Sequence, residues 1–266
     1  MCIMGFPVWP MEPAPAMTDA ILETRNLSRA FGGFLAVDRV NLRVRQDTIH
    51  ALIGPNGAGK TTLFNLLTKF LQPTEGQIIF AGRDITKERA CKLPRLGICR
   101  SFQISATFGS LTALENVRIA LQQKEGTTYY FWRSLSSVQT LDGKALELLA
   151  DVGLEEFANT PAAELPYGRR RALELATTLA LNPTILLLDE PMAGLGLEET
   201  GRITQLIRGV AKGRTVVLVE HNLSVVSDLS DEITVLQRGE ILASGAYAEV
   251  AQRPDVIEAY MGTGDD

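Results

Sequence analysis

The chain has 266 residues, of which 45% are hydrophobic, and it carries a formal net charge of −5 with an isoelectric point of about 5.3. This size and composition suit one large globular domain or a domain with a sizeable insertion, and the acidic balance argues against a nucleic-acid partner. No run of about 18 consecutive apolar residues occurs, and Cys2, Cys91 and Cys99 lack CxxC spacing, so we expect no membrane span, disulfide framework or zinc site, and a reducing, cytosolic compartment.

The N-terminal part is predicted to be a leader followed by β-strands. Residues 1–19 contain four prolines between Pro7 and Pro15 and lack the basic segment of a secretory signal, so we interpret them as a disordered leader, with Met17 as a second candidate start. The runs "AILETRNL", "AVDRVNLRV" and "TIHALIG" then predict an antiparallel β-rich entry. From Thr61 the apolar spacing is helical, and "LQPTEG" predicts a turn before the strand "QIIFAG".

The remainder predicts an α/β core with a helical insertion. Spacing is mostly helical over 104–159 without a sustained seven-residue repeat, so we predict an inserted helical subdomain there. The nucleotide-binding core then comprises 20–103 and 160–245, and a C-terminal helix and tail occupy 246–266. The apolar runs "ILLLD" and "VVLVE" are typical of strands buried on both faces, which predicts a mostly parallel sheet covered by helices.

The stretch "ALIGPNGAGKTTL" contains a phosphate-binding motif. Gly54, Gly59, Lys60 and Thr61 satisfy G-x-x-x-x-G-K-[ST] between a strand and a helix. Glycines let backbone N–H groups approach phosphates, and the helix N-terminus adds positive potential. Lys60 is predicted to bridge the β- and γ-phosphates, and the Thr61 hydroxyl to hold Mg²⁺. The whole predicted loop comprises Gly54, Pro55, Asn56, Gly57, Ala58, Gly59, Lys60, Thr61 and Thr62.

Two strand ends supply the other groups that nucleotide hydrolysis needs. Asp189 ends "TILLLD", where its carboxylate is expected to face the loop and support Mg²⁺, and Glu190 is the candidate general base. His221, which we place at the end of the strand "RTVVLVEH", is the candidate sensor of the γ-phosphate, with helix capping as the alternative. His50, in the middle of a strand, is interpreted as structural.

Together these residues resemble the ATP-binding subunits of ABC transporters, from about Ile21 to the C-terminus. "GPNGAGKTT" looks like Walker A, "ILLLDE" like Walker B and "VEH" like the switch histidine. The resemblance implies that Gln103 in "RSFQ" senses Mg²⁺ and water and couples to the transmembrane subunits. It also implies that Phe31 stacks on adenine, although a core position is the alternative.

Within that family, "FGGFLAVDRVNL", "LPYGRRRALELA" and "PDVIEAYMG" look most like one of the two ATPases of branched-chain amino acid importers. Two departures stand out. The signature LSGGQ is replaced by residues 165–169, "LPYGR", so Gly168 remains as the residue that binds nucleotide in trans, and the D-loop aspartate is Gly196. Because both groups act on the partner's nucleotide, we expect an asymmetric pair in which the site this chain completes for its partner is the weaker one. The alternative is that the loss of the serine is tolerated and both sites are active.

The resemblance implies ATP and Mg²⁺ as cofactors, and transmembrane permease subunits, a second ATPase subunit and, indirectly, a solute-binding protein as partners. The expected location is the inner face of the cell membrane. A soluble ABC-type ATPase and an exporter ATPase remain as alternatives, whereas a GTPase is disfavoured because no N-K-x-D motif occurs.

Two further stretches have more than one interpretation. The aromatic residues at 129–132, "YYFW", are interpreted as packing within the helical subdomain, with permease docking as the alternative. The run Arg169-Arg170-Arg171 is interpreted as a solvated helix start, with contact to nucleotide or to an acidic partner as the alternative.

Overall fold

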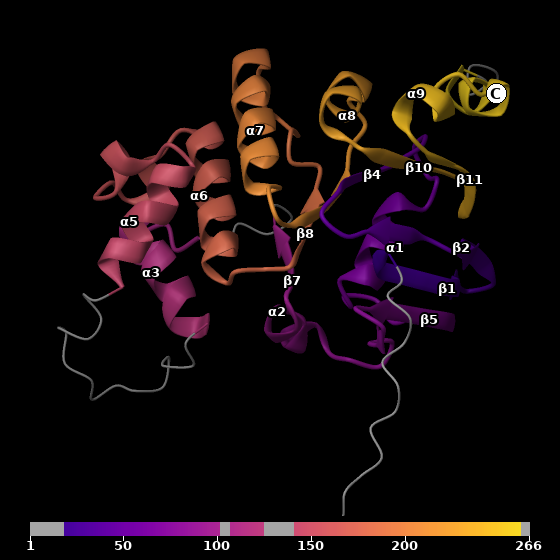
Figure 1. The fold of residues 1–266 in the computed structure, drawn as a ribbon, viewed down its shortest axis with the longest axis horizontal. Coiled ribbons are helices and arrows are strands. Elements are labelled where there is room, and N and C mark those ends of the chain that lie inside the picture. Colours follow the sequence, from indigo (N-terminus) through magenta and orange to yellow (C-terminus); the bar gives the residue numbers. More distant parts are fainter. Residues whose placement is uncertain (1–18, 102–106, 125–140, 262–266) are drawn as a thin grey trace, which may run out of the picture.

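The computed structural model describes residues 19–101, 107–124 and 141–261 and contains two β-sheets (Figure 1). The smaller sheet is antiparallel and has the order β2-β1-β5-β6, with β3 paired to β1. This is the predicted β-rich entry. Its strands are β1 (Ala20–Phe31), β2 (Phe34–Val40), β3 (Arg43–Arg45), β5 (Glu75–Phe80) and β6 (Arg83–Asp84).

The larger sheet has the order β11-β10-β4-β9-β8-β7 and is parallel except for the pair β10–β11. Every residue of β4, β8 and β9 is buried, as the continuous apolar runs predict for strands covered on both faces. The mostly parallel α/β class is therefore confirmed. The strands are β4 (Ile49–Ile53), β7 (Ile98–Ser101), β8 (Ile185–Asp189), β9 (Thr215–Val219), β10 (Glu232–Gln237) and β11 (Glu240–Gly245).

Helices cover both faces of the larger sheet. Val217 and Val219 of β9 pack in one core with α1 (Lys60–Leu67) and the antiparallel sheet, whereas Val216 and Leu218 pack in a second core with the helices of the opposite face. The remaining helices of the described core are α2 (Leu93–Leu96), α7 (Leu197–Val210), α8 (Leu223–Leu229), α9 (Tyr247–Val250), α10 (Pro254–Met261) and the short 3₁₀ turn Ala90–Lys92.

A helical group lies at one end of the molecule, away from the antiparallel sheet (Figure 1). It contains α3 (Ala113–Lys124), α5 (Asp142–Asp151) and α6 (Tyr167–Ala180), which pack against one another, together with the 3₁₀ turns Glu155–Phe157 and Ala162–Glu164. Helix α6 begins after residue 159, the predicted end of the insertion, so the helical group extends further than 104–159. The division of the chain into domains stays a prediction. The aromatic residues at 129–132 lie outside the described residues.

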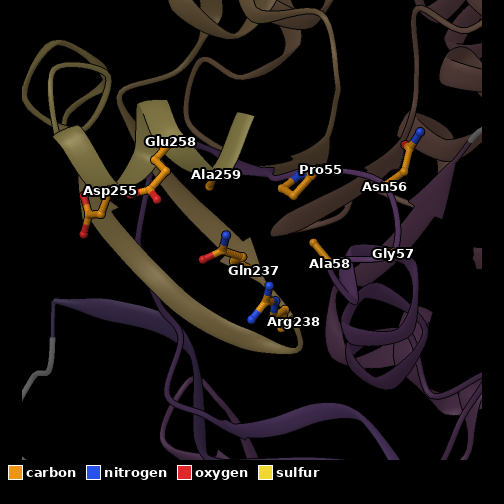
Figure 2. A pocket seen from close by; sticks show the side chains of 9 residues that line it. All are labelled: Pro55, Asn56, Gly57, Ala58, Gln237, Arg238, Asp255, Glu258 and Ala259. Atoms are coloured by element: carbon orange, nitrogen blue, oxygen red, sulfur yellow. The ribbon is translucent and has the colours of Figure 1, made fainter. Parts of the chain in front are cut away.

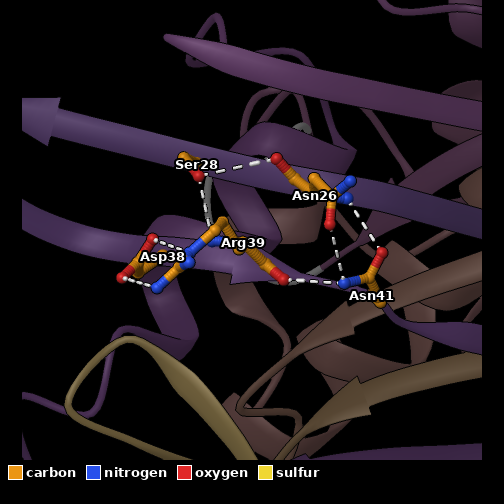
Figure 3. A network of polar contacts seen from close by, with 5 residues as sticks. All are labelled: Asn26, Ser28, Asp38, Arg39 and Asn41. Atoms are coloured by element: carbon orange, nitrogen blue, oxygen red, sulfur yellow. Dashed lines mark hydrogen bonds and ion pairs between the residues drawn. The ribbon is translucent and has the colours of Figure 1, made fainter.

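The stretch "AVDRVNLRV", predicted as one strand, is divided between β2 and β3. Arg39 has φ of 42° within β2, and Asn41 lies between the strands. A polar network fixes this break (Figure 3): Asn41 accepts a bond from the Asn26 backbone N–H (2.9 Å) and donates to the Arg39 carbonyl (2.8 Å), while the Arg39 N–H donates to the Ser28 hydroxyl (2.9 Å). The short polar side chains thus replace ladder bonds where β1 changes its pairing from β3 to β2.

Cys91 is exposed and Cys99 is buried, and both are free thiols. Among the described residues, no helix is both long enough and apolar enough to cross a membrane.

Candidate functional site

The predicted phosphate-binding loop connects β4 to α1 in the strand–loop–helix arrangement that its motif requires. Its lysine folds back over the loop: the Lys60 ammonium donates to the carbonyls of Gly54 (2.7 Å) and Pro55 (2.9 Å). Burial lowers the pKa of Lys60, and the charge of Glu190 partly opposes this shift. The ammonium group is thus held within the loop, close enough to Glu190 to feel its charge.

The glycines of the loop are required for different reasons. A Cβ atom at Gly54 would lie 2.2 Å from the Leu236 carbonyl oxygen, and one at Gly59 would lie 2.5 Å from the Ala36 carbonyl oxygen. Gly57 has φ of 76° with nothing within 4 Å of a built Cβ. Close approach of neighbouring strands therefore requires Gly54 and Gly59, whereas the Cβ position of Gly57 is open.

The carboxyl ends of the central strands bring Asp189 to the loop. Asp189 is level with Val219 on β9, which is itself level with Leu52, two residues before Gly54. Asp189 is 8% exposed, and burial raises its pKa while Arg100 opposes the rise. Asp189 therefore lies, as predicted, at the edge of the sheet that carries the loop.

Arg100 of β7 is a site residue that the sequence analysis missed. Its guanidinium donates to Asp189 (2.6 Å) and to two residues of the α1 segment, Asn65 (2.8 Å) and Thr68 (3.1 Å). The guanidinium carbon also lies 4.8 Å from the centre of the Phe70 ring. The only sequence signal was a cation inside the apolar run "GICRS", next to the stretch that contains Gln103, which lies outside the described residues.

Glu190 is half-buried and has φ of 47°, an uncommon conformation for a non-glycine residue. Its N–H donates to the Val219 carbonyl (3.0 Å), and its carbonyl accepts from the Ala193 N–H (3.0 Å). These bonds define a tight turn directly after β8. Strain of this kind is concentrated at functional sites, where the surrounding structure holds it.

The strand β9 ends at Val219, two residues before His221. The prediction that His221 ends the strand is therefore wrong by two residues. Its side chain is exposed. The capping alternative does not hold either, because Asn222 caps α8, accepting N–H groups from Ser224 (3.1 Å) and Val225 (3.4 Å). His221 is therefore free of a capping role. His50, by contrast, is fully buried in β4 and bonds to Thr234 (2.8 Å).

Phe31 ends β1 and is 42% exposed, which disagrees with the alternative of a core position. The guanidinium carbon of Arg29 lies 4.6 Å from its ring centre. An exposed aromatic ring at the end of a strand presents a face on which a planar base can stack.

The altered signature begins helix α6. Pro166 stands where the serine is expected, and Tyr167, in place of the first glycine, donates to the Ala193 carbonyl (3.3 Å). A Cβ at Gly168 would lie 2.5 Å from Glu199 Oε1, so a carboxylate covers the glycine at the helix N-terminus. Gly196, in the D-loop position, is the N-cap of α7.

The arginine run at the start of α6 is only partly solvated, so its interpretation as a solvated helix start is wrong for two of the three residues. Arg170 is exposed. Arg169 donates to the Gly153 carbonyl (2.7 Å), and Arg171 donates to Tyr167 (2.7 Å) and Glu174 (3.2 Å).

A cavity of about 460 Å³ lies beside the phosphate-binding loop (Figure 2). The loop forms one wall, and the turn between β10 and β11 together with α10 forms the rest. The lining residues are Pro55, Asn56, Gly57, Ala58, Gln237, Arg238, Asp255, Glu258 and Ala259. The C-terminal helix thus borders the loop that is predicted to hold phosphates.

The chemistry of the site fits Mg²⁺ held jointly with a nucleotide. The predicted ligands from the described residues are the Thr61 hydroxyl and the Asp189 carboxylate, which are the hard oxygen donors that Mg²⁺ prefers. Among the described residues there is no group of three or more His, Cys, Asp or Glu side chains that could hold a metal alone. One or two protein oxygens with phosphate oxygens is the usual arrangement for nucleotide-bound Mg²⁺.

Comparisons with known proteins agree with this geometry. The family profile described as "ABC transporter" matches residues 37–193, and the profile described as "Branched-chain amino acid ATP-binding cassette transporter" matches residues 240–266. The second match covers α10, which borders the loop.

Individual relatives match over almost their whole length. The chain is 40% identical over 253 residues to the high-affinity branched-chain amino acid transport ATP-binding protein BraF of Pseudomonas aeruginosa, and 39% identical over 256 residues to LivG of Escherichia coli K12. Each alignment covers 92% of this chain and 99% of the relative.

Solved structures of similar proteins have the same fold. An ATP-binding cassette of an ABC transporter in its ADP conformation has a TM-score of 0.80 and 32% identity, covering 92% of this chain and 100% of that one. A dimeric cassette in a post-hydrolysis state, bound to ADP and Pi, has a TM-score of 0.70 and 28% identity, covering 85% and 98%.

Proposed function

The chain belongs to the ABC transporter family, and from this membership we propose that it is the subunit that binds and hydrolyses ATP to drive an importer of branched-chain or other hydrophobic amino acids. The observation that carries the proposal is that one sheet edge gathers Lys60, Asp189 and Glu190. The match at residues 240–266 and the names of BraF and LivG favour import over the exporter and soluble alternatives.

Each residue of the site has a distinct role in the proposed reaction. Lys60 releases the loop carbonyls and binds the terminal phosphates, and Phe31 stacks on the adenine ring. Glu190 orients the attacking water and accepts its proton, and two backbone hydrogen bonds hold the turn that carries it directly after β8. Mg²⁺, held by Thr61 and Asp189, would neutralise charge on the phosphates.

The partners follow from the family. We propose that the chain works at the inner face of the cell membrane with transmembrane permease subunits and a second ATPase subunit, and that it serves a solute-binding protein indirectly. His221 and Gln103 report the γ-phosphate, which is present before hydrolysis and absent after it, and this difference drives the motion of the partners.

The altered signature supports an asymmetric pair. Pro166 replaces the serine, so its hydroxyl is missing, and the Glu199 carboxylate lies against Gly168, where the partner's γ-phosphate would approach. A carboxylate at a helix N-terminus competes with phosphate for the same positive potential. The site that this chain completes for its partner is therefore proposed to be the weaker of the two.

The test of the proposed function is the variant Glu190→Gln in the assembled transporter, compared with Glu147→Gln on the exposed face of α5. Removing a general base that contributes 10²–10⁴-fold is expected to lower ATP turnover at least about 100-fold while ATP still binds. Glu147→Gln should have no effect. Unchanged turnover in Glu190→Gln would contradict the proposal, and identification of the co-purified membrane proteins tests the importer assignment.

A further inference from the structure

Glu220, between the end of β9 at Val219 and His221, is a fully buried carboxylate with 0% exposure. One of its oxygens accepts the N–H of Met192 (3.0 Å). The other accepts the N–H groups of His221 (3.1 Å) and Asn222 (3.4 Å). All three hydrogen-bond donors are backbone amides, and they come from two loops that are 28 residues apart in sequence.

Burying a carboxylate lowers the stability of the folded protein unless the carboxylate is paired with a cation or well hydrogen-bonded. None of the ion pairs within the described parts of the chain includes Glu220, and its hydrogen-bond partners there are backbone amides. A threonine or valine directly after β9 would carry a lower desolvation penalty. The position of Glu220 therefore calls for a reason beyond the stability of the strand.

The two loops that Glu220 joins carry the candidate base and the candidate sensor. Glu190 begins the turn that contains Met192, and this turn is fastened to β9 at consecutive positions: the Glu190 N–H bonds to the Val219 carbonyl (3.0 Å), and the Met192 N–H bonds to the Glu220 carboxylate. The same carboxylate holds the backbone of His221. One side chain thus bonds to both loops, of which one carries the half-buried Glu190 and the other the exposed His221.

We propose that Glu220 is a positioning residue that fixes Glu190 and His221 relative to each other, so that the water-activating group and the γ-phosphate sensor act as one unit. The proposal rests on the proposed ATPase function. A carboxylate suits this role because both of its oxygens accept hydrogen bonds, so it can serve the two loops at once. The charge also strengthens each bond relative to a neutral acceptor.

The variant Glu220→Gln separates the two loops with little change in volume. Whichever way its amide is turned, the NH₂ group faces a backbone N–H of one loop, so one connection is lost. In the assembled transporter we expect kcat to fall at least about 10-fold, with KM for ATP changed by less than about 2-fold, since the phosphate-binding loop is untouched.

The matched control is Thr24→Val. Thr24 is also buried, and its hydroxyl also bridges two backbone groups, donating to the Val40 carbonyl (2.8 Å) and accepting from the Leu42 N–H (2.8 Å), but it lies in the antiparallel sheet. It should lower the free energy of unfolding without lowering kcat. Equal losses of kcat in Glu220→Gln and Thr24→Val would overturn the proposal, because the effect would then be one of stability alone.

A double-mutant cycle tests whether Glu220 acts through His221. If it does, Glu220→Gln should lower kcat much less in a His221→Ala background than in the wild type. Additive losses would contradict action through the sensor. Because wild-type turnover is measured alongside, an inactive wild type would refute the proposed function, whereas an active wild type with additive variants would refute only this inference.

Amide hydrogen exchange on the full chain gives a readout that is independent of catalysis. In Glu220→Gln, exchange should accelerate together at Met192 and His221 and stay unchanged in β4. If that variant does not fold, Glu220→Asp replaces it: its shorter side chain is expected to keep its own loop and release Met192. Faster exchange at Met192 with unchanged kcat would overturn the proposal.

Discussion

The guanidinium of Arg100 lies 2.6 Å from the carboxylate of Asp189, and both side chains are almost completely buried, at 10% and 7% exposure. Arg100 lies in β7, the strand before Gln103, and it also contacts Asn65 of α1 (2.8 Å). Through Arg100, the candidate Mg²⁺ ligand Asp189 is therefore connected to α1, the helix that follows the phosphate-binding loop. It is also connected to β7, the strand that precedes Gln103.

Removal of Arg100 should destabilise the fold. Arg100→Gln leaves Asp189 as a buried carboxylate without its cation, which is expected to lower the free energy of unfolding by about 3 kcal/mol. Arg83→Gln is the control, because Arg83 forms an ion pair with Glu88 at the same 2.6 Å but is 61% exposed, and it should cost less than about 1 kcal/mol. Urea denaturation measures the free energy of unfolding of both variants. Equal, small decreases in Arg100→Gln and Arg83→Gln would contradict the buried pairing.

The glycines of the phosphate-binding loop should differ in their tolerance of alanine. Gly54→Ala and Gly59→Ala force a Cβ against a backbone oxygen and should lower the free energy of unfolding by more than about 2 kcal/mol. Gly57→Ala has open space for its Cβ, so only its positive φ should lower the free energy of unfolding, by about 1 kcal/mol. Urea denaturation of the three variants checks the order. A loss in Gly57→Ala as large as in the other two would show that the contacts described do not determine the glycine requirement.

His50 predicts a loss of stability in mild acid. Burial, aided by the charge of Arg45, lowers its pKa from 6.5 to about 4, so the unfolded chain takes up a proton in this range before the folded chain does. Stability is then full above pH 6.5 and falls as the pH drops toward 4. Between pH 7.5 and pH 5, protonation of His50 in the unfolded chain should lower the free energy of unfolding by about 2 kcal/mol.

The control for this pH dependence is His50→Gln. The variant should lose about 2 kcal/mol less than the wild type between pH 7.5 and pH 5, since the carboxylates titrate in both proteins. Denaturant titrations at the two pH values give the difference. Parallel losses in the two proteins would mean that His50 is not the group responsible.

The asymmetric pair predicts unequal effects of equivalent variants. In the assembled transporter, Glu190→Gln should lower ATP turnover at least about 10-fold more than the same change in the equivalent glutamate of the second ATPase subunit, because this chain's own loop is the competent site. Steady-state ATPase assays of the two complexes compare them. Equal losses would show that the signature with Tyr167 and Glu199 supports hydrolysis as well as its counterpart.

The sequence predicted the parts of the site that depend on local pattern. The loop at Gly54 and the carboxylates at Asp189 and Glu190 follow from apolar strands that end in polar residues, because parallel strands bring their carboxyl ends to one edge. The continuous apolar runs likewise identified β8 and β9 as doubly covered strands.

Other features depend on tertiary contacts that no local pattern records. In the sequence, Arg100 is a single cation within an apolar run. It reaches the site because β7 pairs with β8. Glu220 reads as part of the switch motif, yet its partner Met192 is identified only by the folded turn. The break between β2 and β3 was missed because Val37, Val40, Leu42 and Val44 are all buried, and the network around Asn41 was not visible in the apolar pattern.

The most direct test of the central claim is equilibrium binding of ATP to the purified full chain, with and without Mg²⁺, for the wild type and for Lys60→Ala. Lys60 is only half-buried and bonds to its own loop, so the variant should fold, and Lys92→Ala, an exposed lysine paired with Glu88, serves as its control. We predict Mg²⁺-dependent binding by the wild type and by Lys92→Ala, and an affinity at least about 10-fold lower in Lys60→Ala. Absence of Mg²⁺-dependent binding in the wild type, or equal affinity in Lys60→Ala, would contradict the account.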